Sequence, residues 1–208
     1  MRVIIVGATG TIGRAVAAAL AHHDVVPVSH SKAHYRVDLA SKESIKHLME
    51  TIGPFDALVS AAGQAAFKPL QDLSDDDFQL SLSNKLMGQV NLVRVGLRYI
   101  NEGGSFTLTS GVLAREPMPG SAAISLVNSG LEGFALAAAL EKPRGVRVNV
   151  VSPPWVTETL KALGMDPSHG IPAAEVAKAY VHSVEGKTNG EIIDARSFGS
   201  KSQSRQPT

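Results

Sequence analysis

The chain has 208 residues, of which 44% are hydrophobic and 19% are charged, and its formal net charge is +1. This length suits one domain with a substantial core, and the near-neutral charge gives no reason to expect nucleic acid or an anionic membrane as a partner. There are no cysteines, which excludes disulfides and thiolate metal sites. Because the amino terminus lacks a signal-peptide pattern and no apolar run reaches the length of a membrane span, a cytoplasmic protein is expected.

Short apolar runs alternate with helical stretches along the whole chain. Most of these runs are apolar on both sides, which is typical of strands in a parallel sheet that is covered on both faces. The expected strands are Arg2–Val6, Asp24–Val28, Ala57–Ser60, Ser105–Thr109, Arg147–Val151 and Glu191–Asp194. The expected helices are Thr11–His22, Ser41–Ile52, Asp75–Ile100, Ala122–Glu141 and Ala173–Val184. This alternation predicts a three-layer, doubly wound parallel α/β sheet of the Rossmann type, in a single domain over residues 1–196.

Local signals predict several boundaries. Ser74 followed by three aspartates, Asp75 to Asp77, is typical of a helix N-cap with acids in the first turn, which explains the triplet better than a metal site does. Pro143 is expected to stop the alanine-rich helix. Residues 197–208 are polar and are expected to form a surface tail.

A glycine-rich segment, Gly7-Ala-Thr-Gly10-Thr-Ile-Gly13-Arg14, directly follows the first expected strand and opens the first expected helix. In that context small residues let the backbone approach a pyrophosphate, and the helix N-terminus offers free N–H groups and a positive dipole end. The segment therefore predicts a dinucleotide-binding loop; the alternative is a tight strand-to-helix turn without a ligand. The residues expected to contact the cofactor here are Gly7, Thr9, Gly10, Thr11, Ile12, Gly13 and Arg14.

The end of the second expected strand indicates which dinucleotide is bound. An acidic residue about 20 residues after the loop would bind a free ribose 2′-hydroxyl, but Asp24, near that distance, stands at the start of the strand. The strand instead leads into Ser29, His30, Ser31 and Lys32, whose hydroxyls and cation suit a 2′-phosphate, and Arg14 could add charge nearby. We therefore expect NADP(H) in preference to NAD(H); the alternative for the lysine is a solvated loop position.

Further segments, taken in chain order, resemble motifs of the short-chain dehydrogenase/reductase family. The resemblance spans nearly the whole chain, although the chain is shorter than most members around Thr157–Pro172, where a substrate-covering lid usually lies, and its glycine spacing resembles the extended and atypical branches. The matching segments are Val37-Asp38-Leu39, Ser60-Ala61-Ala62-Gly63, Asn84-Lys-Leu-Met-Gly88, Thr109-Ser110-Gly111, Arg147-Val-Asn-Val-Val-Ser-Pro153-Pro-Trp-Val156-Thr157 and Asn189-Gly190-Glu-Ile-Ile-Asp194.

The resemblance implies roles for individual residues. Ser110 matches a serine that hydrogen-bonds the substrate carbonyl, and Asn84 matches an asparagine that holds a water for proton relay. It also implies a homodimer or homotetramer that pairs through the two long helices. Ala135 to Ala139 are compatible with close helix packing, and burial inside a monomer would give the same pattern. The cofactor-binding residues that it implies are Asp38, Leu39, Ser60, Ala61, Ala62, Gly63, Asn128, Pro153 and Val156.

The helix that carries the family's Tyr-x-x-x-Lys pair departs from the pattern. Ile124 stands at the tyrosine position and Asn128 at the lysine position. Ile124 has no ionisable group, whereas the amide of Asn128 can still bond a ribose hydroxyl but brings no charge. Sliding the register by one residue gives Ser125 with Ser129, which is no acid–base pair either. Loss of a general acid removes roughly 10² to 10⁴ in rate; Arg115 or His169 could supply a proton instead.

Two functions follow from this pattern. The first is an NADP(H)-dependent oxidoreductase that acts on a small carbonyl or alcohol substrate by non-standard proton transfer. The second is a catalytically inactive dinucleotide-binding sensor or scaffold protein. A purely structural protein with an empty pocket is a third possibility, against which the glycine loop argues.

Overall fold

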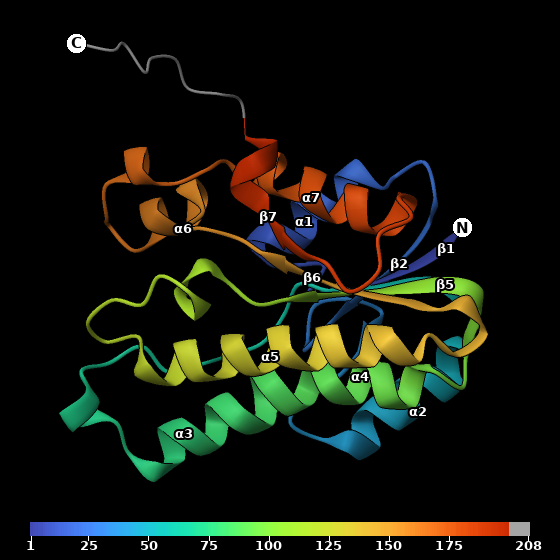
Figure 1. Ribbon diagram of the computed structural model, residues 1–208, viewed down its shortest axis with the longest axis horizontal. Coiled ribbons are helices and arrows are strands. Elements are labelled where there is room, and N and C mark those ends of the chain that lie inside the picture. Colours follow the sequence, from blue (N-terminus) through green and yellow to red (C-terminus); the bar gives the residue numbers. More distant parts are fainter. Residues whose placement is uncertain (200–208) are drawn as a thin grey trace.

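The structure, a computed structural model, describes residues 1–199 and is built around one parallel sheet (Figure 1). Its seven strands are ordered β3-β2-β1-β4-β5-β6-β7, and all neighbours pair in parallel. The doubly wound α/β fold expected from the sequence is therefore confirmed. The strands are β1 (Arg2–Val6), β2 (Asp24–Ser29), β3 (Tyr35–Arg36), β4 (Phe55–Ser60), β5 (Ile100–Thr109), β6 (Arg147–Ser152) and β7 (Ile192–Asp194).

Helices cover both faces of the sheet. On one face lie α1 (Thr11–Ala19) and α7 (Ala173–Glu185); on the other lie α2 (Lys42–Ile52), α4 (Gly88–Gly96) and α5 (Ala122–Glu141) (Figure 1). Alternate residues of each central strand serve the two faces, so that one apolar cluster forms under α1 and α7 and another under α2, α4 and α5. Burial on both faces explains why the strand sequences show no polar alternation.

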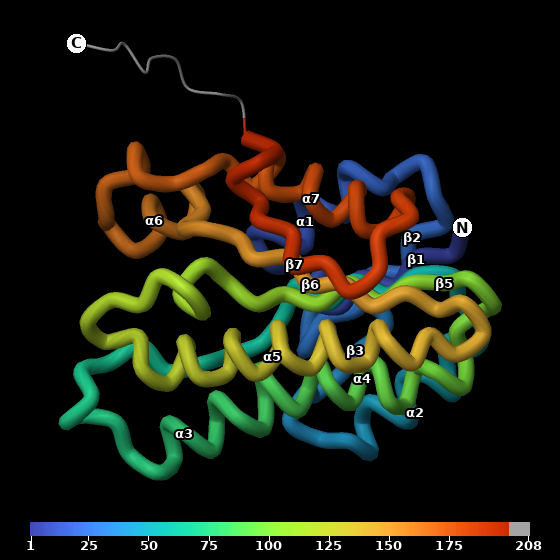
Figure 2. Tube along the Cα trace, viewed as in Figure 1, coloured from blue at the N-terminus to red at the C-terminus, as the bar shows by residue number. Residues whose placement is uncertain are grey.

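The prediction of one continuous helix over Asp75–Ile100 is wrong. The structure has α3 (Asp75–Ser81), a π-helical segment over Leu82–Met87 and then α4, which ends at Gly96. Figure 2 shows these pieces following one another within one layer. A capping box between Ser74 and Asp77 fixes the start. At the other end a turn closes from Tyr99 N–H to the Gly96 carbonyl oxygen, so Ile100 begins β5 instead.

Other boundaries differ by smaller amounts. The first helix ends at Ala19 and not at His22, because a turn bond from His23 N–H to the Leu20 carbonyl oxygen reverses the chain. The two-residue strand β3 and the short helix α6 (Thr157–Ala162) were not expected. The alanine-rich helix α5 ends at Glu141, ahead of Pro143, as expected.

Helix α5 departs from the expectation that no apolar run reaches the length of a membrane span. Among the described residues 1–199 it is the one helix long and apolar enough to cross a membrane, with a mean hydropathy of 1.5. It packs against β6 as a layer helix, with Val127 and Leu131 fully buried. Ala135 and Ala139 are also buried inside the chain, which agrees with the alternative of burial within a monomer, whereas Leu136 and Ala137 between them are exposed.

The predicted tail boundary at residue 197 falls inside a short 3₁₀ helix, Ala195–Phe198. There the ring of Phe198 lies 5.4 Å from that of His182. Residues 200–208, most of the predicted tail, lie outside the described residues.

Candidate dinucleotide and catalytic site

The glycine loop after β1 is held tightly between two strand ends. The N–H groups of Gly7 and Ala8 donate to the Val28 carbonyl oxygen at 2.9 and 3.1 Å, which ties the loop to the end of β2. Gly7 has φ +89°, and a Cβ there would lie 2.6 Å from the Ala61 carbonyl oxygen, at the end of β4. A Cβ on Gly13 would lie 2.0 Å from the Gly7 carbonyl oxygen. The loop therefore requires glycine at both positions.

The N-terminus of α1 opens directly from this loop. Gly10 is the N-cap and provides no capping side chain, so the first N–H groups of the helix, at Thr11 and Ile12, are left to bond a ligand. The Arg14 guanidinium donates to the Thr9 carbonyl oxygen at 2.6 Å, which places a positive charge over the loop. This combination of free N–H groups, helix dipole and cation fits the diphosphate of a dinucleotide.

The segment after β2 divides the predicted 2′-phosphate residues into two groups. His30, Ser31 and Lys32 are exposed beside the glycine loop, where they can contact a ligand. Ser29 is buried, and its hydroxyl oxygen accepts from the N–H groups of Lys32 and Ala33 at 2.8 and 2.7 Å. Ser29 therefore shapes the turn that presents its neighbours, a side-chain role that the sequence did not distinguish from ligand binding.

Asp38 and Leu39 lie at the turn into α2. Leu39 is buried against the backbone of Gly88. A Cβ added to Gly88 would lie 2.8 Å from the Leu39 Cβ. Asp38 is exposed, and its carboxylate accepts from the Ala40 N–H at 2.9 Å. Asp38 remains open to solvent on the ligand edge of the sheet, as contact with an adenine ring would require.

The Ser60-Ala61-Ala62-Gly63 run continues β4 at the same edge. The Ser60 hydroxyl is fully buried and has no hydrogen-bond partner. Asn84, on the π-helical segment, accepts from the Gln64 N–H at 2.8 Å through its side-chain oxygen. This bond ties the Asn84 amide to the loop that follows β4, and the water relay that the resemblance implies for Asn84 stays a prediction.

A pocket of about 160 Å³ lies where the ends of β5 and β6 meet the start of α5. It brings together residues that the sequence analysis singled out from three separate motifs. Asn128 is 1% exposed and its Oδ1 has no hydrogen-bond partner, an arrangement that a ligand hydroxyl would satisfy. The residues of these motifs that line the pocket are Ser110, Ile124, Asn128, Pro153, Trp155 and Val156.

Ser110 lines the pocket, but its hydroxyl is already hydrogen-bonded to another side chain. Its hydroxyl donates to the buried Glu132 carboxylate at 3.0 Å, and the Arg115 guanidinium pairs with that carboxylate at 3.6 Å. To polarise a substrate carbonyl, as the sequence analysis expected, the hydroxyl must turn away from Glu132. Arg115 is itself held by this ion pair, which argues against it as a proton donor.

The other substitutes considered for the missing tyrosine are also engaged elsewhere. His169 is exposed and lies 3.8 Å from the Asp166 carboxylate. Ser125 donates to the Ser121 hydroxyl, and Ser129 donates to the Ala114 carbonyl oxygen. Within the described part of the chain, none of the three lines the pocket.

Sequence reasoning missed Lys85, which is buried directly behind the pocket. Its ammonium lies 3.5 Å from the carbonyl oxygens of both Thr109 and Ser110, and burial lowers the pKa of Lys85 to about 8. A lysine next to Asn84 was visible in the sequence. Its inward direction depends on the π-helical segment, which no sequence pattern indicated.

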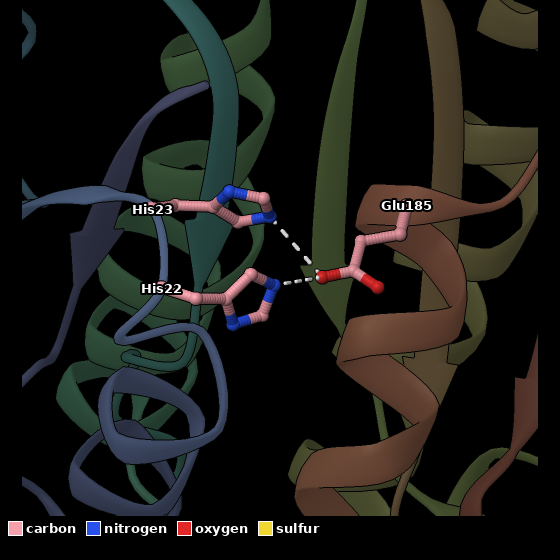
Figure 3. Close-up of side chains that lie close together, drawn as sticks. All are labelled: His22, His23 and Glu185. Atoms are coloured by element: carbon pink, nitrogen blue, oxygen red, sulfur yellow. Dashed lines mark hydrogen bonds and ion pairs between the residues drawn. The ribbon is translucent and has the colours of Figure 1, made fainter.

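A separate cluster of ligand-type side chains lies at the opposite edge of the sheet, where β2 begins (Figure 3). His22 and His23 both point at one carboxylate oxygen of Glu185, with distances of 2.7 and 3.1 Å from Nε2 to Oε1. The three ligand atoms lie within 4.8 Å of one another, close enough to share a metal ion. One carboxylate oxygen already engages Nε2 of both imidazoles, and the cluster lies away from the dinucleotide site.

Comparison with proteins of known family identifies the chain's relatives. A sequence profile described as Enoyl-(Acyl carrier protein) reductase matches residues 14–193. An uncharacterized oxidoreductase of Methylorubrum extorquens is 27% identical over 199 residues, which cover 82% of this chain and 80% of that protein. A hydroxynaphthalene reductase of Aspergillus fumigatus is 28% identical over 156 residues, and the match covers 69% of this chain but only 57% of that enzyme.

Solved structures agree with the profile. A protein from Listeria innocua is 37% identical, with a TM-score of 0.89, and the superposition covers 93% of this chain and 98% of that one. A small-chain dehydrogenase solved in complex with NADPH is 27% identical, with a TM-score of 0.82 and coverage of 93% and 95%. The chain belongs to the short-chain dehydrogenase/reductase family of oxidoreductases.

Proposed function

We propose that the protein binds NADP(H) and acts as an oxidoreductase on a small carbonyl or alcohol substrate, with proton transfer that uses no tyrosine. Four buried side-chain atoms of the described residues lack a hydrogen-bond partner, in Ser60, Asn128, Ser152 and Thr188. The observation that carries this proposal is that two of them, Ser60 Oγ and Asn128 Oδ1, belong to motifs expected to contact the cofactor. They belong to the same sheet edge as the glycine loop. Buried polar groups are rarely left unpaired, so these two support a polar ligand on this edge.

Different residues of the chain have different roles in the proposed reaction. The α1 N-terminus and Arg14 hold the diphosphate, and the Asn128 amide bonds a ribose hydroxyl. NADPH held there would supply the hydride for reducing a carbonyl compound, a reaction in which carbonyl, NADPH and a proton give alcohol and NADP⁺. Ser110, turned from Glu132, donates a hydrogen bond to the substrate oxygen and stabilises the negative charge that develops there.

Specificity for the phosphorylated cofactor is proposed from Lys32. NADPH is expected to bind at least about tenfold more tightly than NADH, because charge-assisted hydrogen bonds to the 2′-phosphate are worth about 1.5–3 kcal/mol. Lys32→Ala should remove most of that difference by weakening NADPH alone, whereas Lys46→Ala, an exposed lysine on α2, should change neither affinity. Calorimetric titration measures both; equal affinities of the wild-type protein for NADPH and NADH would refute this assignment.

An inactive dinucleotide-binding sensor or scaffold is the second candidate. It is favoured by the Ser110–Glu132 hydrogen bond and by Ile124, which places an aliphatic side chain in the pocket at the position where a proton donor is needed. Under this alternative the cofactor binds and no substrate turns over.

Turnover of NADPH separates the two candidates. We expect NADPH oxidation with at least one small carbonyl in a broad panel, and a loss of about 100- to 1000-fold in kcat/KM on Ser110→Ala, because one donor to the substrate oxygen is removed. NADPH affinity should stay unchanged in this variant. Tight NADPH binding without turnover of any panel member would reject the oxidoreductase and favour the sensor or scaffold.

We propose that the protein is cytoplasmic and that it assembles with further copies of itself. A homodimer or homotetramer fits three leucines of α5 that remain exposed on the single chain, namely Leu126, Leu136 and Leu140, with exposed fractions of 50%, 43% and 87%. Apolar side chains on one long helix favour association with a second copy.

A further inference from the structure

A buried lysine reaches across two strand ends beneath the pocket, and the functions proposed above do not use it. Lys85 is 8% exposed. Its aliphatic stem packs against Gly63, after β4, where an added Cβ would lie 3.0 Å from Lys85 Cγ. Its ammonium points to the end of β5, 3.5 Å from the carbonyl oxygens of Thr109 and Ser110. The charge therefore lies behind the residue that faces the substrate.

This ammonium has no counter-ion. In the part of the chain that the structure describes, no carboxylate lies within ion-pair distance of Lys85. Gln89 on α4 donates to the Lys85 carbonyl oxygen and is engaged in two hydrogen bonds with the Thr109 backbone. From α5, Glu132 is bound to Ser110 and to the Arg115 guanidinium; from α7, across the sheet, Tyr180 is neutral and bonded to the Thr109 hydroxyl.

We propose that the Lys85 ammonium selects the oxidation state of the bound dinucleotide. An oxidised nicotinamide ring carries a positive charge, whereas the reduced ring is neutral, so an uncompensated cation beneath the ring opposes NADP⁺ and leaves NADPH unaffected. The inference rests on the proposed function, because it requires the nicotinamide to occupy the pocket at Ser110 and Asn128. Lys85 acts here through its field and touches neither substrate nor cofactor.

The charge distribution of the site favours this role over a structural one. If position 85 only filled space in the fold, an apolar residue of similar volume would stabilise the protein more, because burying an unpaired ammonium costs free energy. The family resemblance places a lysine on α5, where this chain has Asn128. Among residues 1–199 the one buried lysine is Lys85, which comes from the π-helical segment. Charges a few ångströms apart in a buried site change affinities by about tenfold or more.

The pH dependence has a definite sign. Burial lowers the pKa of Lys85 to about 8, so the ammonium is present below that pH and is lost as pH rises through it. The preference for NADPH over NADP⁺ is therefore largest near about pH 6.5 and disappears by about pH 9.5. The 2′-phosphate titrates in both oxidation states alike, so it cancels from the ratio of the two affinities.

The experiment measures dissociation constants of NADPH and NADP⁺ by calorimetry at these two pH values and at pH 8. The wild-type ratio is expected to fall by about tenfold across this range. Lys85→Met, which keeps the volume and removes the charge, should have the low ratio at every pH, and Lys85→Arg should have the high ratio at every pH. Lys46→Met serves as the control for loss of an exposed lysine and should follow the wild-type protein.

The possible results distinguish this inference from the proposed function. If neither dinucleotide binds the wild-type protein, both fail. If both bind and the ratio is the same at all pH values in wild type and in Lys85→Met, the role of Lys85 is overturned and the dinucleotide site stands. The wild-type pH series alone decides the matter if either variant does not fold.

Discussion

Replacing Gly13 by alanine is expected to disrupt the nucleotide loop and abolish dinucleotide binding. The new Cβ would lie 2.0 Å from the Gly7 carbonyl oxygen and 3.0 Å from Ala8 Cα, and both are backbone atoms that cannot move without displacing the end of β1. Overpacking of this severity costs about 3 kcal/mol or more in the free energy of unfolding. Thermal unfolding should show a fall of about 6–12 °C in Tm, and calorimetry should show no NADPH binding.

Gly133→Ala is the matched control for this substitution. Gly133 lies in the middle of α5, and a Cβ there meets no atom within 4 Å. The change should raise the free energy of unfolding by about 0.5–1 kcal/mol, because glycine is the poorer helix former, and should leave NADPH affinity unchanged. A Gly13→Ala protein with wild-type Tm and wild-type NADPH affinity would show that the loop does not pack as described.

The double substitution Ile124→Tyr with Asn128→Lys is expected to raise turnover by about 100-fold or more, because it supplies a general acid. The two positions lie one helical turn apart on α5, and both side chains line the pocket with Ser110. A phenol with a pKa near about 10 needs a neighbouring cation to act near neutral pH, which is why both changes are made together. The readout is kcat/KM for the best carbonyl found with the wild-type protein.

The control for the double substitution is Ile124→Phe with Asn128→Lys. It fills the same space and brings the same charge but lacks the hydroxyl. If the tyrosine variant is no faster than the phenylalanine variant, the pocket does not place a substrate oxygen beside position 124, and the sensor or scaffold function gains support.

The sequence was sufficient to predict the fold and to bring the candidate site residues to one edge of the sheet. Apolar runs such as Arg2–Val6 and Arg147–Val151 are two-sided because both faces of their strands are covered, and this pattern is local in sequence. The carboxyl ends of parallel strands meet at one edge, so the glycine loop, Ser60 and Ser110 could be placed together once the strands were known.

Features that depend on contacts between distant segments could not be predicted. The π-helical segment Leu82–Met87 turns Lys85 inward, and no periodicity marks it. The Ser110 hydrogen bond to Glu132 joins residues on β5 and α5, and only the packed structure shows that the hydroxyl is already engaged. Ser29 was assigned to the ligand because a turn-shaping serine and a ligand-binding serine look alike in sequence.

The central claim is that the glycine loop and the pocket together form an NADP(H) site, and direct titration of the protein with NADPH tests it. We predict saturable binding of one NADPH per chain, with a dissociation constant on the order of 1–100 µM. Loss of that binding in Gly13→Ala and its retention in Gly133→Ala would place the ligand on the loop. No saturable binding of NADPH, NADP⁺ or NADH to the folded wild-type protein would contradict the account.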